Sequence, residues 1–121
     1  MMVRGSLVSV VDDDESVRES VPHLLRSFGF TSQGFSSAEE FLESDFVDQT
    51  KCLVLDIAMP GMSGPALQKE LERRRKNIPI VFITARGEES LRMLEAGAVE
   101  CLLKPFSETA LLNAITAALR G

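Results

Sequence analysis

The sequence predicts an α/β fold in which a doubly wound parallel sheet of five strands carries helices on both faces. Short apolar runs alternate with amphipathic helical segments along all 121 residues, without a linker or low-complexity segment. Such alternation is typical of parallel sheets, whose strands are joined by helical crossovers. The chain is too short for a closed eight-stranded barrel. An open five-stranded sheet in one domain, residues 1–121, is therefore expected.

The composition indicates a globular domain and argues against several other classes. Hydrophobic residues make up 45% of the chain and charged residues 26%, which argues against disorder. The net charge of −5 argues against direct contact with nucleic acid. No signal peptide and no membrane-spanning apolar stretch is recognisable. Cys52 and Cys101 follow no metal or redox spacing, so we expect free thiols in a reducing cytoplasm.

The first strand and helix are predicted over residues 7–11 and 15–27. The apolar run at 7–11 is typical of a buried strand. Apolar side chains then recur at helical spacing as far as Ser27. Pro22 removes one backbone donor from this helix, so a bend or local weakening is expected there. Gly29 ends the segment.

A weaker strand at residues 30–35 leads into a short helix. Two serines at 36 and 37 precede Glu39 and Glu40, which is a doubled capping-box pattern. The helix is expected to run to about Ser44.

The third strand, residues 51–57, is an apolar run that meets the acidic residue Asp56 near its end. A Pro60-Gly61 turn follows directly. The next helix is predicted to begin at Ser63 or Gly64, with a proline in its first turn, and to end near Lys76.

The remaining segments repeat the pattern. Apolar runs predict two further strands, and amphipathic segments predict two further helices, the last capped by a serine. The expected ranges are a strand at 78–84, a helix at 88–96, a strand at 99–103 and a helix from the cap Ser107 to Leu119.

Polar side chains stand where four of these strands end. The first strand ends on Asp12 and Asp13, the third on Asp56, the fourth on Thr84 and the fifth on Lys104. Because the carboxyl ends of parallel strands share one edge of a sheet, and ligands bind there in open α/β folds, we expect these side chains around one crevice.

This set of residue types indicates phosphoryl chemistry. Neighbouring carboxylates repel one another unless a cation is present, and oxygen ligands without His or Cys favour Mg²⁺. Mg²⁺ suits phosphoryl transfer. Lys104 can pair with Asp56 or with a phosphoryl oxygen, and Thr84 can donate a hydrogen bond. Asp56 is then a candidate nucleophile that forms an acyl phosphate; the alternative is that Asp56 only caps its turn.

Five stretches along the chain carry a resemblance to a known family. They are, in order, Val11-Asp12-Asp13-Asp14-Glu15, Leu55-Asp56-Ile57-Ala58-Met59-Pro60-Gly61-Met62-Ser63-Gly64, Ile83-Thr84-Ala85, Ala96-Gly97-Ala98 and Lys104-Pro105-Phe106. In these stretches, which cover essentially the whole chain, the sequence resembles the response-regulator receiver domains of bacterial two-component signalling, and its style is nearest to receivers that precede helix-turn-helix output domains. The resemblance implies a flavodoxin-like sheet with strand order 2-1-3-4-5 and five helices.

The resemblance also implies a role for each site residue. Asp56 would accept a phosphoryl group from the phosphohistidine of a sensor histidine kinase. Asp13, Asp56 and the carbonyl of Ala58 would bind Mg²⁺ directly, and Asp12 would act through a water. Thr84 would move to bond the phosphoryl group.

Lys104 would pair with the phosphoryl group, and its bond to Pro105 would be cis, as is usual in the family. Asp14 and Glu15 are expected to cap the first helix instead of binding metal.

Two departures from the family pattern concern the switch. Most receivers have Tyr or Phe three residues before the Lys, where this chain has Cys101; it is expected to fill apolar space, with a redox role as the alternative. The segment between Thr84 and Lys104 is also shorter than usual, which predicts a short or irregular fourth helix. Many receivers form phosphorylation-dependent homodimers through helix four, strand five and helix five. We therefore expect intact chemistry with an atypical output surface.

Three functions fit the sequence to different degrees. A phosphorylation-switched signalling module, which turns over no metabolite and is not an enzyme, is favoured by the full set of acids, Thr and Lys. A phosphate-independent interaction module on the same fold is the alternative that Cys101 favours. A Mg²⁺-dependent phosphatase is disfavoured because the second acid typical of such enzymes is replaced by Ala58. The style of the motifs favours a receiver from a longer transcription factor, with a C-terminal DNA-binding domain, over a single-domain regulator.

Overall fold

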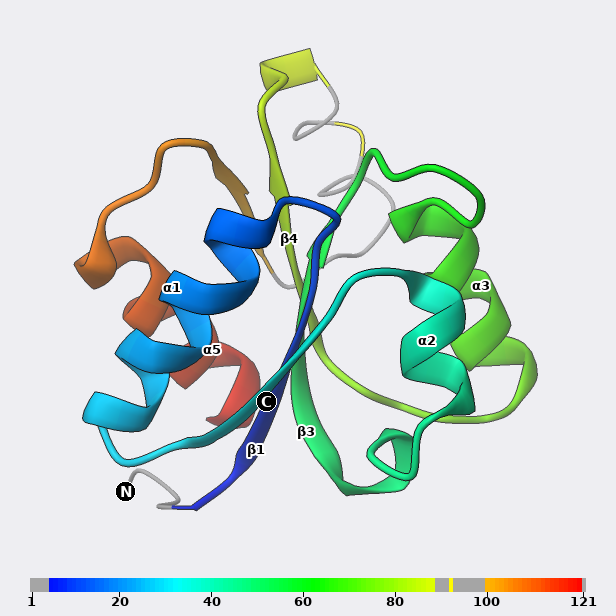
Figure 1. Ribbon diagram of the computed structural model, residues 1–121, viewed down its shortest axis with the longest axis horizontal. Coiled ribbons are helices and arrows are strands. Elements are labelled where there is room, and N and C mark those ends of the chain that lie inside the picture. Colours follow the sequence, from blue (N-terminus) through cyan, green and yellow to red (C-terminus); the bar gives the residue numbers. More distant parts are fainter. Residues whose placement is uncertain (1–4, 89–91, 93–99, 121) are drawn as a thin grey trace.

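A parallel sheet of five strands forms the centre of the molecule (Figure 1). The computed structural model describes residues 5–88, 92 and 100–120. The order of the strands is β2-β1-β3-β4-β5, and each neighbouring pair is parallel. Both the sheet and the strand order predicted from the sequence are thereby confirmed. The strands are β1 (Leu7–Val11), β2 (Thr31–Phe35), β3 (Thr50–Asp56), β4 (Ile80–Thr84) and β5 (Glu100–Leu103).

Helices cover both faces of this sheet. In Figure 1, α1 and α5 lie on one face, and α2 and α3 lie on the other. The described part of the chain contains α1 (Glu15–Ser27), α2 (Ala38–Glu43), the 3₁₀ turn η1 (Val47–Gln49), α3 (Gly64–Arg73) and α5 (Glu108–Arg120). The helix predicted at residues 88–96 falls almost wholly outside the described residues. The five-helix count and the shortened fourth helix therefore stay predictions.

Side-chain caps fix where the helices begin. In each case the oxygen of the cap accepts a hydrogen bond from a backbone N–H of the first turn, which satisfies a donor that has no partner within the helix. The predicted caps are confirmed for Asp14 at α1, Ser37 at α2, Ser63 at α3 and Ser107 at α5.

Helix α3 ends at Arg73, earlier than the predicted end near Lys76. Arg75 adopts a left-handed backbone conformation, with a φ of 59°. The N–H of Lys76 then donates to the carbonyl of Leu71 at 2.9 Å. This is the Schellman pattern, in which the chain turns out of the helix while the last carbonyls keep their partners. A run of good helix formers does not reveal this ending.

Strand β4 begins at Ile80 and not at the predicted Ile78. Pro79 stands immediately before it, and proline has no N–H to donate to a neighbouring strand. Its carbonyl still accepts a hydrogen bond from the N–H of Leu53 at 3.0 Å. The strand β4 therefore starts two residues later than predicted, because the apolar pattern extends further upstream than the hydrogen-bonded ladder.

Two apolar clusters, one on each face of the sheet, form the core. Successive residues of a strand point to opposite faces, so Cys52 and Val54 pack with α1 and α5, whereas Leu53 and Leu55 pack with α2 and α3. Cys101 belongs to the α2 and α3 side, opposite Cys52. Neither cysteine forms a disulfide, as predicted, and the two face different sides of the sheet.

No described helix has the length and the apolar character that crossing a bilayer would require.

Candidate functional site

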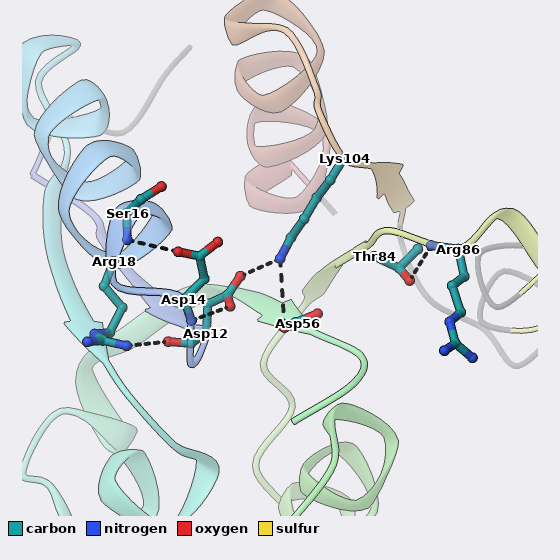
Figure 2. Close-up of polar contacts among 8 residues, drawn as sticks. All are labelled: Asp12, Asp14, Ser16, Arg18, Asp56, Thr84, Arg86 and Lys104. Carbon is teal, nitrogen blue, oxygen red and sulfur yellow. Dashed lines mark hydrogen bonds and ion pairs between the residues drawn. The ribbon is translucent and has the colours of Figure 1, made fainter. Parts of the chain in front are cut away.

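The polar residues predicted to meet at one edge of the sheet do lie together. The strand register aligns Val11 of β1 with Leu55 of β3, and Thr84 of β4 with Leu103 of β5. The residues that end or follow these strands are therefore level with one another. Figure 2 shows Asp12, Asp56 and Lys104 directed toward one another, and Thr84 at the end of β4 with its side chain toward Arg86.

Three carboxylates form the centre of this edge. Oxygens of Asp12, Asp13 and Asp56 lie within 4.8 Å of one another. Asp12 and Asp56 are buried, with 0% and 6% of their surface exposed, whereas Asp13 is exposed. An all-oxygen donor set that opens to solvent on one side is what a hard divalent cation such as Mg²⁺ requires. The three acids therefore fit such an ion.

Lys104 supplies positive charge to this cluster (Figure 2). Its Nζ lies 2.9 Å from Oδ2 of Asp12 and 3.7 Å from Oδ2 of Asp56. From the sequence, Lys104 was expected to pair with Asp56 or with a phosphoryl oxygen. The structure has the contact with Asp56 but places the shorter one on Asp12, the carboxylate with no exposure to water. A fully buried charge needs a partner most. The Lys104–Pro105 peptide bond is cis, as the family resemblance implied.

The environment of Asp56 favours its neutral form. Burial, and next the charge of Asp12, raise the pKa of the Asp56 carboxyl to about 7, although the charge of Lys104 and a backbone hydrogen bond from Ala58 partly offset the rise. A cation at this position would replace the missing positive charge and favour the ionised carboxylate. The site is thus arranged so that ionisation of Asp56 and binding of a cation support each other.

The same charges act on Lys104. Burial alone would lower the pKa of its ammonium group, but the hydrogen bond to Asp12 and the charges of Asp12, Asp56 and Asp14 raise the pKa on balance. Lys104 is therefore a fixed positive charge in this site.

Backbone contacts hold Asp12 in place. The N–H of Asp14 donates to Oδ1 of Asp12 at 2.9 Å, and Nη1 of Arg18 donates to the carbonyl of Asp12 at 3.2 Å. The second carboxylate oxygen of Asp12 accepts from Lys104. Because both of its carboxylate oxygens accept hydrogen bonds, the side chain of Asp12 is held in one orientation.

The hydroxyl of Thr84 is turned away from Asp56. Its Oγ1 accepts a hydrogen bond from the backbone N–H of Arg86 at 3.0 Å. Figure 2 shows this hydroxyl directed toward Arg86, on the side away from Lys104. Thr84 is almost fully buried, at 2% exposure. The predicted residue is thus at the site, with its hydroxyl bonded to the loop that follows β4.

Two other predicted site residues, Ala58 and Cys101, differ in their exposure to solvent. Ala58 is exposed in the loop after β3, and its backbone hydrogen bond to Asp56 places it beside the carboxylate cluster. Cys101 is 8% exposed and packs in the apolar cluster under α2 and α3. Its packing agrees with the expectation that it fills apolar space.

Sequence reasoning missed the backbone partners of the site. The N–H of Arg86 bonds the Thr84 hydroxyl two residues before it, a local pattern that Thr side chains often form and that could have been anticipated. Arg18 reaches the Asp12 carbonyl from one turn into α1. Nothing in the sequence indicates this contact, because it depends on how α1 packs against the strand.

Fold and site together define a class of protein, a doubly wound α/β domain with an acidic, lysine-containing cluster at the carboxyl edge of its sheet. Comparison with known proteins identifies the family: the sequence model described as the response regulator receiver domain matches residues 8–116. The chain therefore belongs to the response-regulator receiver domains, which are signalling domains of two-component systems.

Three individual proteins illustrate the likeness. The chain is 46% identical over 115 residues to nodulation protein W of Bradyrhizobium diazoefficiens, covering 93% of this chain and 51% of that protein. It is 41% identical over 122 residues to the response regulator protein TodT of Pseudomonas putida, covering 99% of this chain and 54% of that protein. A solved structure of the response regulator StyR matches with 52% identity and a TM-score of 0.85, covering 94% of this chain and 59% of that one.

The chain thus spans about half the length of the curated relatives it matches. Other relatives are transcriptional regulatory proteins, among them TdiR of Thauera aromatica, which is 40% identical over 117 residues.

Proposed function

We propose that this chain is the phosphoacceptor of a two-component system, in which Asp56 takes a phosphoryl group from a sensor histidine kinase in a Mg²⁺-dependent reaction. The observation that carries this proposal is the juxtaposition of three carboxylates within 4.8 Å and an ammonium group 2.9 Å from one of them. Such an arrangement balances charge only when a cation joins it. Family membership supports the same conclusion.

In the transfer step, a carboxylate oxygen of Asp56 forms a bond to phosphorus as the bond from phosphorus to the kinase imidazole nitrogen breaks. The imidazole keeps that electron pair and takes up a proton, and the product is an acyl phosphate on Asp56. Asp13, Asp56 and the Ala58 carbonyl would hold Mg²⁺, with Asp12 acting through a water. When bound, Mg²⁺ would offset negative charge on the phosphoryl oxygens.

Lys104 and Thr84 would then contact the phosphoryl group on Asp56. The ammonium group of Lys104 would pair with a phosphoryl oxygen, while Asp12 would keep its orientation and act on the metal through a water. The hydroxyl of Thr84 would exchange its contact with the Arg86 N–H for a phosphoryl oxygen. That rotation would carry the signal into the loop after β4, and Cys101 would form part of the switch in place of the usual aromatic residue.

We further propose a single receiver domain over residues 1–121 that turns over no metabolite. The relatives that are transcriptional regulators support a C-terminal DNA-binding domain as its output. Dimerisation on phosphorylation and a cytoplasmic location complete the proposal. Two buried cysteines that form no disulfide fit a reducing compartment. The receiver itself would contact neither nucleic acid nor membrane.

The alternative is an interaction module that keeps the fold and signals without phosphate. Cys101, which stands where an aromatic residue usually reports the position of the threonine, is the observation that favours it. The two functions differ in one measurable property, the ability of Asp56 to become phosphorylated.

Intact-mass spectrometry tests the proposal. The protein is incubated with acetyl phosphate, with and without Mg²⁺, beside Asp56→Asn and the surface control Asp45→Asn. The expected result is a single phosphoryl adduct on wild type and Asp45→Asn, only in the presence of Mg²⁺, and none on Asp56→Asn. Absence of an adduct on wild type, with Mg²⁺ binding demonstrated, would favour the interaction module.

A further inference from the structure

The loop that follows Asp56 contains a turn at Gly61 and Met62. A carboxylate from helix α2 contacts this turn. Oε2 of Glu39, in the first turn of α2, accepts a hydrogen bond from the backbone N–H of Met62 at 3.2 Å. The same oxygen lies so close to Gly61 that a Cβ built there would be 2.8 Å from it. Gly61 also has a φ of 74°, which favours glycine. The turn and the carboxylate are therefore fitted to each other.

This turn belongs to the loop that carries Ala58. Both ends of the loop are fixed by backbone hydrogen bonds. At its start the N–H of Ile57 donates to the carbonyl of Ile83 in β4 at 3.1 Å, and at its end the N–H of Gly64 donates to the carbonyl of Ile57 at 2.9 Å. Met59 is buried in the core. Between these anchors the chain crosses the exposed turn that Glu39 contacts.

Helix α2 holds the backbone of Glu39 in a fixed position. Ser37 caps it through the N–H of Glu40, and Glu40 in turn accepts a hydrogen bond from the N–H of Ser36 at 2.9 Å. Ala38 and Phe41 are completely buried in the core cluster that also contains Met59. The backbone that carries Glu39 is thus fixed relative to the sheet, so that its side-chain oxygen can accept a hydrogen bond from the Met62 N–H.

We propose that Glu39 is a positioning residue for the phosphoacceptor site: by holding the turn at Met62 it keeps the backbone of Ala58 beside Asp56, in the place where its carbonyl can bind Mg²⁺. This inference rests on the proposed function. It assigns to Glu39 a role in metal affinity, without contact to the metal or to the phosphoryl group.

The experiment compares Glu39→Ala and Glu39→Gln with wild type. Glutamine keeps an acceptor oxygen and is the conservative variant; Glu43→Ala removes an exposed acid from the end of the same helix and is the matched control. Mg²⁺ is titrated by calorimetry, the rate of adduct formation from acetyl phosphate is measured against Mg²⁺ concentration, and exchange of the Met62 amide proton is followed by NMR in the metal-free protein.

For Glu39→Ala we expect a weaker Mg²⁺ affinity, by about threefold to tenfold. The Mg²⁺ concentration for half-maximal phosphorylation should rise by the same factor, with the rate at saturation unchanged, and the Met62 amide should exchange faster. Glu39→Gln and Glu43→Ala should stay within about twofold of wild type in all three measurements. This split between affinity and saturated rate is not expected of general destabilisation.

Two results would overturn the inference while leaving the proposed function intact. One is that Glu39→Ala binds Mg²⁺ as tightly as wild type and exchanges its Met62 amide proton at the same rate. The other is an equal loss in Glu39→Ala and Glu39→Gln together with a lower unfolding temperature, which would make Glu39 a purely structural residue. Failure of wild type itself to bind Mg²⁺ and to become phosphorylated would instead overturn the proposed function and this inference with it.

Discussion

Asp56→Asn should make the metal-free protein more stable, and the gain should grow with pH. Asp56 is buried beside Asp12, and its pKa rises from 3.8 to about 7 in the folded protein. The folded state therefore holds a proton that the unfolded state has already released across that interval. Between those two pH values the free energy of unfolding of wild type falls as pH rises.

The size of the effect follows from the shift in pKa. Each pKa unit corresponds to about 1.4 kcal/mol, so the wild-type penalty reaches an upper limit of about 4 kcal/mol above neutral pH. Asparagine has nearly the same shape and no charge, and the attraction to Lys104, 3.7 Å away, that it gives up is already contained in the shifted pKa. We therefore expect a net gain for Asp56→Asn at about pH 8 that approaches, but does not exceed, this limit of about 4 kcal/mol.

Urea unfolding between about pH 5 and about pH 8.5 measures this difference. Runs in a chelator should show the gap between the two proteins widening up to neutral pH and then levelling off. Adding Mg²⁺ should stabilise wild type alone and narrow the gap, because the ion binds only the folded carboxylate cluster. A gap that is constant over the whole range, or a less stable Asp56→Asn, would contradict this prediction. The exposed variant Asp45→Asn, measured in parallel, is the control for the loss of a surface carboxylate.

Three further outcomes are expected. Lys104→Ala should lower the free energy of unfolding by about 1–3 kcal/mol in chelator, because it removes the ammonium group that is bonded to fully buried Asp12. Adding Mg²⁺ should restore part of the lost free energy. Unchanged midpoints of urea unfolding would contradict this. Gly64→Ala should lower the free energy of unfolding by more than about 2 kcal/mol, as measured by thermal unfolding, since its Cβ would lie 2.5 Å from the carbonyl oxygen of Asp56. Gly87→Ala, which has open space around its Cβ, should leave the stability nearly unchanged. Equal effects of the two variants would contradict the described loop geometry. Burial raises the pKa of the Cys52 thiol to about 12, so iodoacetamide should modify it in urea but not in the folded protein, as peptide mass spectrometry can show.

The sheet and its carboxyl edge were predictable from the sequence because they depend on local patterns. Apolar runs that end on Asp12, Asp56, Thr84 and Lys104 give both the strands and the residues that meet at their ends. Caps such as Ser37 also act within a few residues of their own position. Parallel topology then brings distant segments together without further information.

What the sequence could not give is the detail that depends on packing between elements. Whether Lys104 lies nearer to Asp12 or to Asp56 depends on which carboxylate is more deeply buried. The end of α3 at Arg73 depends on a left-handed residue that is not a glycine. The contact of Glu39 with Met62 joins α2 to a loop 23 positions away, and neither segment carries a pattern that predicts the other.

The central claim, that Asp56 is the residue that becomes phosphorylated, can be tested at the level of a single side chain. The protein is treated with acetyl phosphate and Mg²⁺ and then with borohydride, which reduces an acyl phosphate to an alcohol, and peptide mass spectrometry locates the change. We expect reduction at position 56 alone. Reduction at Asp12 or Asp13, or none at all in a protein that binds Mg²⁺, would contradict it.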